Sequence, residues 1–492
     1  MDLPIQSVEL DIPKPNLNDL RSDLDRFKEA LHDAGYPADI KLPYEVLETF
    51  SNVLREQNWS CTTVIRNNEV TAILPKGTLP LGLAVDVGTT KVAAYLINMD
   101  DGSVLTRQGA MNPQVAYGED VISRIHYANH TSGGAKILQS TLIDTLNRLV
   151  EEMCASTGNS PGSVVEAVIA GNTAMHHLVA GLPVKQLGFS PYVPAVNESL
   201  EVECARIGLK LASGAKVFLP PNIAGFVGAD HVAMLLSTGA AESSKNVIAL
   251  DIGTNTEISL VTKGQITCCS CASGPAFEGA HIKDGMRAAP GAVERVWIAG
   301  EDIRVRTIDD AKPVGICGSG ILDAVAELLG AGALDSNGSF RPGHPLVRAV
   351  DGKREALLVP AGSSGSGQDI TVTRKDINEI QLAKGAIRAG IDVLLEDAGL
   401  SADSIDEFIV AGAFGTYLDI SSAIKIGMFP SLPLSRFQQV GNAAGAGAVQ
   451  MLVSKRQREK AASLAVKLNY IELTTNKDFR DIFFRGLLFS IT

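Results

Sequence analysis

Two short stretches of the sequence carry, in the same order, residue types that hold phosphate. Residues 85–91 and 250–257 each run from an apolar strand into Asp-x-Gly-Thr, and a second apolar run follows. The aspartate at the strand end projects a carboxylate, and glycine lets the backbone approach a ligand closely. The threonine hydroxyl and the turn amides can hydrogen-bond phosphate oxygens. One copy would be an ordinary hairpin turn, whereas two copies predict a duplicated domain with a phosphate-binding hairpin in each half.

A third stretch offers a surface for the rest of a nucleotide. Residues 408–416 form an apolar run that breaks into Gly-Ala-Phe-Gly. Its glycines, Gly412 and Gly415, allow a flat backbone surface against which a purine ring or a ribose can lie. Residues 315–320 and 441–448 are rich in small side chains, which is typical of segments that pack closely on another backbone.

The composition is that of a globular protein and excludes some classes of function. The chain has 492 residues, enough for three domains, of which 45% are hydrophobic and 20% charged. A formal net charge of −12 argues against a nucleic-acid groove or a site for an anionic membrane surface. No apolar segment is long enough to span a bilayer, and no secretory signal begins the chain. Seven scattered cysteines argue against a disulfide framework and predict that the protein is located in the reducing cytoplasm.

Local patterns divide the chain into four predicted segments. Residues 1–18 form an extended linker, because several prolines oppose helix there. Residues 19–80 form a small α+β domain, for which we expect a packing or dimerising role. Residues 81–245 and 246–492 are the two halves of the duplicated domain. Predicted helices are 18–34, 43–59, 140–154, 318–329 and 375–397, and predicted strands are 61–65, 69–74, 164–170, 247–251, 257–261 and 408–411.

The two hairpins, the small-residue helix and the late glycine-rich strand end resemble the superfamily of acetate and sugar kinases, actin and heat-shock chaperone ATPases. The resemblance implies an α/β fold, a duplicated actin-like ATPase domain with a mixed five-stranded sheet in each half and ATP with Mg²⁺ in the cleft between them. Asp86 and Asp251 would be catalytic and orient the waters of Mg²⁺. Expected contacts to ATP or its phosphates are Gly88, Thr89, Thr90, Lys91, Gly253, Thr254, Asn255, Gly318 and Ser319, with Gly412 and Gly415 holding the adenosine. Lys91 either adds positive charge near the phosphates or points away along its strand.

A finer resemblance covers nearly the whole chain. It rests on four long strings in order, residues 112–125, 171–177, 220–230 and 274–288. These strings are similar to those of the reductive activators of corrinoid proteins, ATPases that restore an inactive Co(II) corrinoid to Co(I). The resemblance implies ATP-dependent activation of a corrinoid protein partner. It also implies a homodimer formed through the domain at 19–80.

One feature departs from this family. Its members usually begin with a domain whose clustered cysteines hold a [2Fe-2S] centre, but this sequence has no cysteine before Cys61 and no spacing that suits such a cluster. We therefore expect no iron-sulfur cluster in this chain. The electrons would come from an iron-sulfur domain that has been removed or that is a separate polypeptide.

Two pairs of charged residues leave their roles open. Glu119 and Asp120 are expected to be catalytic and to share a helical face near the γ-phosphate with Arg124, the alternative being a surface salt bridge. Lys384 and Arg388 lie one helical turn apart. They fit either a solvated helix face or a nucleotide contact.

Histidine and cysteine clusters favour a structural interpretation. His176 and His177 follow Asn-Thr at a predicted helix start, and no third metal ligand is placed by the sequence. Cys268, Cys269 and Cys271 lack a fourth ligand, so we predict small buried side chains rather than a metal or redox site.

Two rival functions share this scaffold. A small-molecule kinase would transfer the γ-phosphoryl group to a sugar or an acid and needs a general base, for which Asp120 and Asp230 are candidates. A chaperone-like module is disfavoured, because no peptide-binding domain is expected after the nucleotide fold. In an activator, ATP binding would stabilise a closed state that grips the corrinoid protein and displaces a cobalt ligand. Roughly 5.5 kcal/mol of differential affinity reverses a 1:99 equilibrium.

Overall fold

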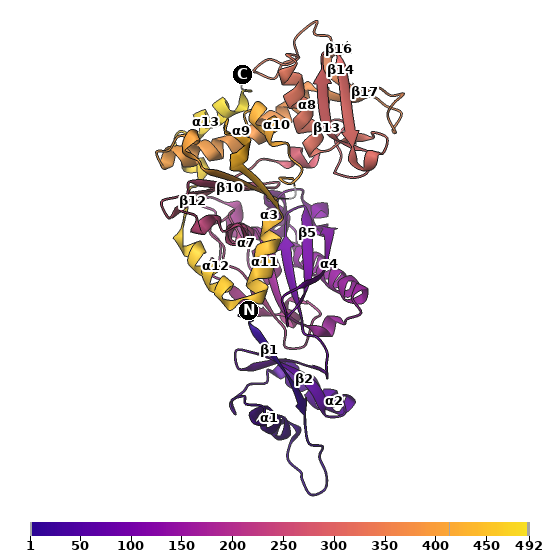
Figure 1. The fold of residues 1–492 in the computed structure, drawn as a ribbon, viewed down its shortest axis with the longest axis vertical. Coiled ribbons are helices and arrows are strands. Elements are labelled where there is room, and N and C mark those ends of the chain that lie inside the picture. Colours follow the sequence, from indigo (N-terminus) through magenta and orange to yellow (C-terminus); the bar gives the residue numbers. More distant parts are fainter. Residues whose placement is uncertain (1, 413, 490–492) are drawn as a thin grey trace. The chain divides into compact units, whose positions relative to one another are not determined.

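The computed structural model describes residues 2–412 and 414–489, which group into two compact units (Figure 1). Unit 1 consists of Met1–Ser237 and Ala444–Val466, and unit 2 of Thr238–Ala443 and Lys467–Thr492. The late segment Ala444–Val466 thus belongs with the N-terminal part of the chain. A division of the sequence into successive segments does not reveal this return.

Unit 1 begins with a small α+β domain. Its antiparallel sheet has the order β1-β2-β3, with strands β1 Ile5–Asp11, β2 Ser60–Arg66 and β3 Glu69–Pro75, and its helices are α1 Asp23–Asp33 and α2 Tyr44–Glu56. Phe27 and Phe50 meet edge to face in its core, with ring centroids 5.1 Å apart. Helix α1 begins after its N-cap Ser22, later than the sequence pattern predicted. Asp19 lies in a turn before the helix, where its carboxylate forms an ion pair with Arg26 of α1.

The rest of unit 1 is built on a six-stranded mixed sheet of order β6-β5-β4-β7-β9-β8. Its strands are β4 Leu81–Val87, β5 Lys91–Asn98, β6 Val104–Met111, β7 Val164–Gly171, β8 Leu200–Glu203 and β9 Lys216–Leu219. Its helices are α3 Val121–His130, α4 Gly134–Ser156, α5 Thr173–Ala180, α6 Cys204–Ile207, α7 Ala229–Thr238, α11 Ala443–Val453 and α12 Lys455–Lys467.

Unit 2 has its own six-stranded sheet, of order β20-β19-β10-β11-β12-β21, and two three-stranded sheets, β14-β13-β15 and β16-β17-β18. The large sheet consists of β10 Val247–Ile252, β11 Thr256–Thr262, β12 Gln265–Cys271, β19 Glu407–Ala411, β20 Phe437–Gly441 and β21 Leu468–Tyr470. The small sheets consist of β13 Ala292–Ala299, β14 Asp302–Thr307, β15 Gly315–Ile316, β16 Val347–Val350, β17 Lys353–Val359 and β18 Ile370–Thr373. The helices are α8 Gly318–Gly330, α9 Arg374–Asp397, α10 Ile420–Lys425 and α13 Phe479–Leu487.

The two large sheets confirm the predicted duplication. Strand β4 is antiparallel to β5 and parallel to β7, and β10 is likewise antiparallel to β11 and parallel to β19. The neighbours beyond them repeat as well, with β6 and β12 antiparallel on one side and β9 and β20 parallel on the other. The expected five-stranded core therefore occurs twice. Each sheet adds one edge strand, β8 in unit 1 and β21 in unit 2.

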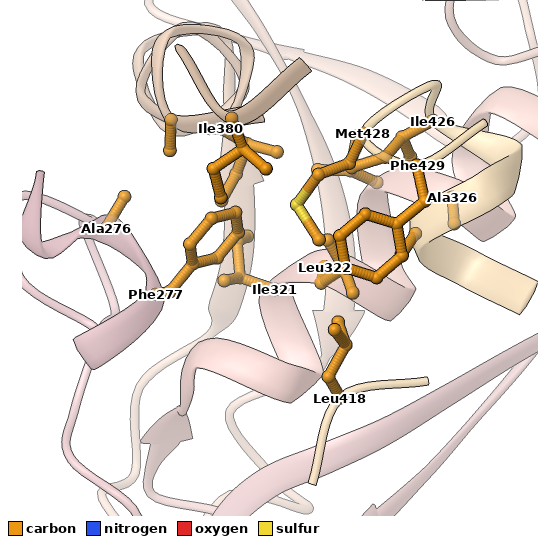
Figure 2. Close-up of a cluster of buried hydrophobic side chains, with 14 of the residues drawn as sticks. Ala276, Phe277, Ile321, Leu322, Ala326, Ile380, Leu418, Ile426, Met428 and Phe429 are labelled. Atoms are coloured by element: carbon orange, nitrogen blue, oxygen red, sulfur yellow. The ribbon is translucent and has the colours of Figure 1, made fainter. Parts of the chain in front are cut away.

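Figure 2 shows the apolar core of unit 2 around helix α8. Ile321, Leu322 and Ala326 of α8 are fully buried. Their partners in this core include Ala276, Phe277, Ile380 of α9, Leu418, Ile426, Met428 and Phe429. Burying one such side chain contributes about 1.5–3 kcal/mol, so this face fixes the rotation of α8 about its axis.

A buried charge cluster ties three parts of unit 1 together. The carboxylate of Glu166 on β7 is inaccessible to solvent and lies 2.9 Å from Arg66 Nε of β2 and 2.8 Å from Arg458 Nη2 of α12. Arg66 also pairs with Glu201 of β8. Because an unpaired buried charge costs several kcal/mol, this cluster fixes the small domain and α12 to the sheet of unit 1.

Helix α11 confirms the predicted close packing of the small-residue run. A Cβ atom added to Gly447 would lie 2.1 Å from the backbone oxygen of Ala233 on α7, which is nearer than any real Cβ contact. Within the described residues, no helix has the length and apolarity needed to cross a membrane.

We expect Gly447→Ala to destabilise unit 1 by about 1–3 kcal/mol, because its methyl group would push α11 away from the α7 backbone. Gly362→Ala is the matched control, since a Cβ there meets nothing within 4 Å. Equilibrium unfolding in urea measures both changes. Equal midpoints for the two variants would contradict the close approach.

Candidate functional site

The first Asp-x-Gly-Thr hairpin lies in the middle of the unit 1 sheet. Asp86 is the penultimate residue of β4 and pairs across the ladder with Ala93 of β5, and Gly88–Thr90 form the turn between the strands. Side chains two residues apart on a strand share a face, so Lys91 and Tyr95 lie on the same face of the hairpin as Asp86. Burial, together with the charge of Asp86, raises the pKa of the Tyr95 phenol. Lys91 is exposed beside the turn.

Three buried side chains hold this first turn from behind. Asn112 Nδ2 donates to the Gly88 oxygen at 2.9 Å, and Arg124 Nη2 donates to the Thr89 oxygen at 2.5 Å. Asn172 Nδ2 donates to Thr89 Oγ1 at 3.1 Å. Two carbonyl groups of the turn are therefore engaged on the protein side. A turn held in this way can present backbone N–H groups to an anion.

The predicted helical face shared by Glu119, Asp120 and Arg124 is not formed. Helix α3 begins at Val121, and Asp120 is its N-cap, whose carboxylate accepts from the Ser123 amide at 2.7 Å. Arg124 is fully buried and donates to backbone oxygens, including that of Gly118 at 2.9 Å. Glu119 is exposed in the preceding turn. The cation that the sequence placed near a γ-phosphate instead supports the backbone of the first turn.

The histidine pair has the structural environment that the sequence favoured. His177 Nδ1 donates to the Thr173 oxygen at 2.8 Å, and its Nε2 accepts from the Ala195 amide at 3.0 Å, so the ring is neutral. His176 is 2% exposed, and burial lowers its pKa to about 3. Thr173 Oγ1 in turn donates to the Ala224 oxygen at 2.6 Å, which attaches the string 220–230 to the start of α5.

The second Asp-x-Gly-Thr hairpin lies in unit 2, and different residues hold its turn. Ser273 Oγ lies 3.2 Å from the Gly253 oxygen and 3.3 Å from the Thr254 oxygen, and the Gly274 amide donates to the Thr254 oxygen at 3.0 Å. The turn carbonyls are again engaged on the protein side. The Thr254 hydroxyl donates to Glu278 Oε1 at 2.8 Å, which adds a second carboxylate to the hairpin that carries Asp251.

The structure brings Gly412 next to Asp251. Gly412 follows β19 with φ of +93°, and a Cβ atom there would lie 2.6 Å from Asp251 Oδ1 and from the Ile252 oxygen. Any larger residue would fill the space beside the carboxylate. Gly415 turns the chain tightly against Ala411, where a Cβ would lie 2.4 Å from the backbone oxygen. Ala413, between the two glycines, lies outside the described residues.

The glycine-rich start of α8 is buried against backbone. A Cβ on Gly318 would lie 1.8 Å from the Phe277 oxygen, and one on Gly320 would lie 2.0 Å from the Val293 oxygen. Ser319 is 5% exposed, with its hydroxyl 3.4 Å from Cys317 Sγ. These residues set how closely α8 approaches the turn at Pro275–Glu278.

Two other groups of reactive side chains belong to the core of unit 2. Cys268, Cys269 and Cys271 of β12 are buried as predicted, and burial raises the pKa of each thiol. Lys384 is also buried, and its ammonium donates to the Leu488 oxygen, so it holds the C-terminal segment rather than a solvated face. Within the described residues no cluster of three or more His, Cys, Asp or Glu side chains is arranged to hold a metal ion.

Sequence reasoning named Asp86, Asp251 and the turn residues but missed the side chains that hold the turns. Asn112, Asn172, Glu278 and Arg124, the last of which was named in another role, lie within the four long strings, whereas Ser273 lies just before the last string. Their position within those strings was the one signal in the sequence that could have identified them as site residues. Their bonding partners depend on tertiary packing and cannot be read from spacing.

Models of three regions of one protein family match consecutive parts of the chain. The model described as the RACo linker region matches residues 1–79, and the RACo middle region matches residues 81–243. The model described as the C-terminal domain of RACo, the ASKHA domain, matches residues 245–492.

Individual relatives agree with these matches. The corrinoid activation enzyme RamQ of Eubacterium limosum is 32% identical over 467 residues, which cover 92% of this chain and 78% of RamQ. The [Co(II) methylated amine-specific corrinoid protein] reductase of Methanosarcina barkeri is 25% identical over 435 residues, covering 82% of this chain and 76% of that protein. The solved structure of a reductive activator for corrinoid, iron-sulfur protein has 35% identity and a TM-score of 0.86, covering 99% of this chain and 79% of that one.

We expect Arg124→Lys to loosen the first turn, because a lysine cannot donate to both the Gly118 and Thr89 oxygens with a planar fork. Loss of a charge-assisted hydrogen bond costs roughly 1.5–3 kcal/mol. Hydrogen exchange of the amides at 88–91 and urea unfolding measure the effect. Arg148→Lys, at an exposed arginine of α4, is the control. Unchanged exchange in Arg124→Lys would contradict the role of the buried guanidinium.

The burial of His176 predicts that unit 1 loses stability at acidic pH. The pKa of His176 falls from about 6.5 in the unfolded chain to about 3 in the folded one, so below pH 6.5 the unfolded state binds a proton that the folded state does not. The contribution of neutral His176 to the free energy of unfolding is therefore fully present above pH 6.5. It decreases as the pH falls toward 3, by about 1.4 kcal/mol per pH unit. We expect His176→Gln to reduce this slope by about one proton between pH 6 and 4. Urea unfolding across that range measures it, and identical slopes for both proteins would contradict it.

Proposed function

This chain belongs to the family of reductive activators of corrinoid proteins, and from that premise we propose that it couples ATP hydrolysis to reduction of a corrinoid protein from Co(II) to Co(I). Its matched relatives are a corrinoid activation enzyme and a corrinoid protein reductase. The chain supplies ATP binding, ATP hydrolysis and docking of the corrinoid protein. The electron comes from an iron-sulfur donor.

The observation that carries the ATP proposal is the repetition of one turn at one place in both sheets. Each turn follows a buried strand whose penultimate residue is an aspartate, Asp86 or Asp251, and in each the turn carbonyls are bonded on the protein side. Both arrangements favour a bound polyanion accompanied by a divalent cation, because amides attract phosphate oxygens and carboxylates attract Mg²⁺ through water. The residues present therefore fit ATP and Mg²⁺.

We assign roles to the expected site residues on this basis. Asp86 and Asp251 would orient the waters of Mg²⁺, and the turn residues Gly88, Thr89, Thr90, Gly253, Thr254 and Asn255 would contact phosphate oxygens, with Gly318 and Ser319 at the start of α8. Lys91, exposed beside the first turn, adds positive charge. Gly412 keeps space open beside Asp251 and, with Gly415, lies against the adenosine. Mg²⁺ supplies charge neutralisation of the developing phosphate anion.

The coupling is a conformational one. Hydrolysis converts ATP and water into ADP and inorganic phosphate, while one electron passes from the reduced iron-sulfur donor to cobalt and converts Co(II) to Co(I). ATP binding would stabilise the state that grips the corrinoid protein and displaces a cobalt ligand, which would raise the cobalt potential. About 1.4 kcal/mol of differential affinity gives a tenfold shift. Hydrolysis then releases the partner. Dimerisation through the domain at 19–80 and a cytoplasmic location complete the proposal.

A small-molecule kinase remains the alternative. The structure offers little to favour it, since the Asp120 carboxylate caps helix α3 and one Asp230 oxygen accepts from the His231 amide. Neither carboxylate is presented as an evident general base. Phosphate transfer to a metabolite, with no response to a corrinoid protein, would support the kinase and contradict the activator.

We expect Asp86→Asn and Asp251→Asn each to lower Mg²⁺-dependent ATP hydrolysis at least 100-fold, because the amide loses the charge that orients Mg²⁺ waters. Hydrolysis is measured for the intact protein alone and with a corrinoid protein held as Co(II) or Co(I). Stimulation only by the Co(II) form is the expected result. Asp302→Asn, at an exposed site on β14, is the control. Full activity in both variants would contradict the assignment.

A further inference from the structure

Helix α3 carries the one pair of histidines in the sequence that is spaced by one helical turn. His126 and His130 are four residues apart on this helix, and both side chains are exposed. Side chains at positions i and i+4 lie on the same face of a helix, so two imidazoles at this spacing can reach one ligand. None of the roles assigned above uses either histidine.

The two imidazole rings lie face to face, and one of them has a fixed tautomer. Their centroids are 4.0 Å apart, and the ring planes differ by 20°. His130 Nδ1 lies 2.9 Å from the backbone oxygen of His126. A carbonyl oxygen can only accept, so Nδ1 carries a proton and the lone pair of the neutral His130 ring lies on Nε2. Histidines that bind metals usually have this arrangement, because a backbone acceptor on one nitrogen orients the other toward the ion.

Both rings border a hollow in the surface of unit 1, with a volume of about 510 Å³. Four residues with hydroxyl groups line it as well, namely Tyr117, Ser123, Tyr127 and Thr131. Tyr117 comes from the short helical turn Pro113–Tyr117, and its ring packs on that of Tyr127 with centroids 4.9 Å apart. The hollow is therefore formed by α3 and the residues next to it in the sequence.

The lining of the hollow indicates which class of ligand fits. Among the described residues that line it there is no lysine or arginine to repel a cation, and no carboxylate of the kind that Mg²⁺ and Ca²⁺ prefer. Neutral imidazole nitrogens instead favour borderline divalent ions such as Zn²⁺, Ni²⁺ and Cu²⁺. Two histidines would fill two coordination positions, and hydroxyl groups can hydrogen-bond waters in the others.

Other soft ligands in the chain lack these properties. His177 on α5 has both ring nitrogens engaged with backbone groups, and its neighbour His176 is inaccessible to solvent. All seven cysteines are buried as well. Exposure and helical spacing together therefore distinguish the pair on α3 as the accessible chelating group.

Binding of one ion by both rings requires a rotation of His126. In stacked rings the lone pairs run nearly parallel, whereas in a chelate both must point at an ion about 2.0–2.1 Å away. The His126 ring is exposed, and the terminal torsion of histidine is a soft one, so this ring can turn toward the ion. His130 keeps its bond to the His126 oxygen and supplies Nε2.

We propose that His126 and His130 chelate a borderline divalent cation of the Zn²⁺ class, through His130 Nε2 and a ring nitrogen of His126, with water in the remaining positions. The inference concerns unit 1 alone and does not depend on the proposed ATP binding. The ion would join two successive turns of the helix whose Arg124 donates to the Thr89 oxygen, so it would bind on the element that supports the first Asp-x-Gly-Thr turn.

Calorimetric titration of the full chain with Zn²⁺, in buffer without nucleotide, tests this inference. We expect His126→Gln and His130→Gln each to weaken the strongest Zn²⁺ site roughly 100-fold, because the second imidazole of a chelate binds intramolecularly. His32→Gln, at an exposed single histidine of α1, is the matched control and should leave the affinity unchanged. Failure of the native chain to bind Zn²⁺, or an affinity unchanged in either α3 variant, would overturn the assignment.

Magnetic resonance of the imidazole C–H groups provides a second, independent readout. The chain has eight histidines, and the signals that disappear in His126→Gln and His130→Gln identify the pair on α3. We expect the first equivalent of Zn²⁺ to shift these two signals, and an equal amount of Mg²⁺ to leave them in place. Shifts confined to the other histidines, or an equal response to Mg²⁺, would overturn the placement of the site.

Discussion

The arrangement of the two hairpins depends on how their turn carbonyls are bonded. A turn can offer its amides to an anion only if its carbonyl oxygens are directed elsewhere, because both groups alternate along one backbone. In unit 1 the oxygens of Gly88 and Thr89 are bonded by Asn112 and Arg124. In unit 2 the oxygen of Thr254 is bonded by the Gly274 amide. These donors come from the loops and helix starts around each turn, so the position of those segments determines which turn groups remain available.

The two halves solve the same constraint with different chemistry. The first turn is supported by a buried guanidinium, whereas the second has a carboxylate, Glu278, bonded to the Thr254 hydroxyl. Arginine contributes a fixed positive charge behind the first turn, and Glu278 adds a negative one beside the second. We infer that the duplicated hairpins have diverged in polarity. On the proposed ATP binding, the guanidinium would add to the attraction of the first turn for phosphate oxygens, and Glu278 would add to the attraction of the second hairpin for the accompanying cation.

The sequence predicted those parts of the fold that depend on local patterns. Strands β4, β10 and β19 are apolar runs that end in glycine-containing turns, and the small residues of α11 indicated close packing before its partner α7 was known. Positions that depend on distant partners were not predictable. The sequence left the roles of Arg124 and Lys384 open between a surface position and a nucleotide contact. Both are buried, and both donate hydrogen bonds to backbone oxygens of other elements. Likewise, helix α3 begins only after its N-cap Asp120, so the expected helical face of Glu119, Asp120 and Arg124 does not form.

The hydrogen bonds of both turns bear on how the proposed ATP turnover would act on a corrinoid protein. Each turn is joined to its own sheet by buried hydrogen bonds, and the strands that carry Asp86 and Asp251 are almost wholly buried. Reshaping either turn would break several of these bonds at roughly 1–3 kcal/mol each. Moving a sheet together with its turn breaks none of them. On the proposed ATP binding, we therefore expect nucleotide-dependent change to displace whole elements, while both turns keep their shape.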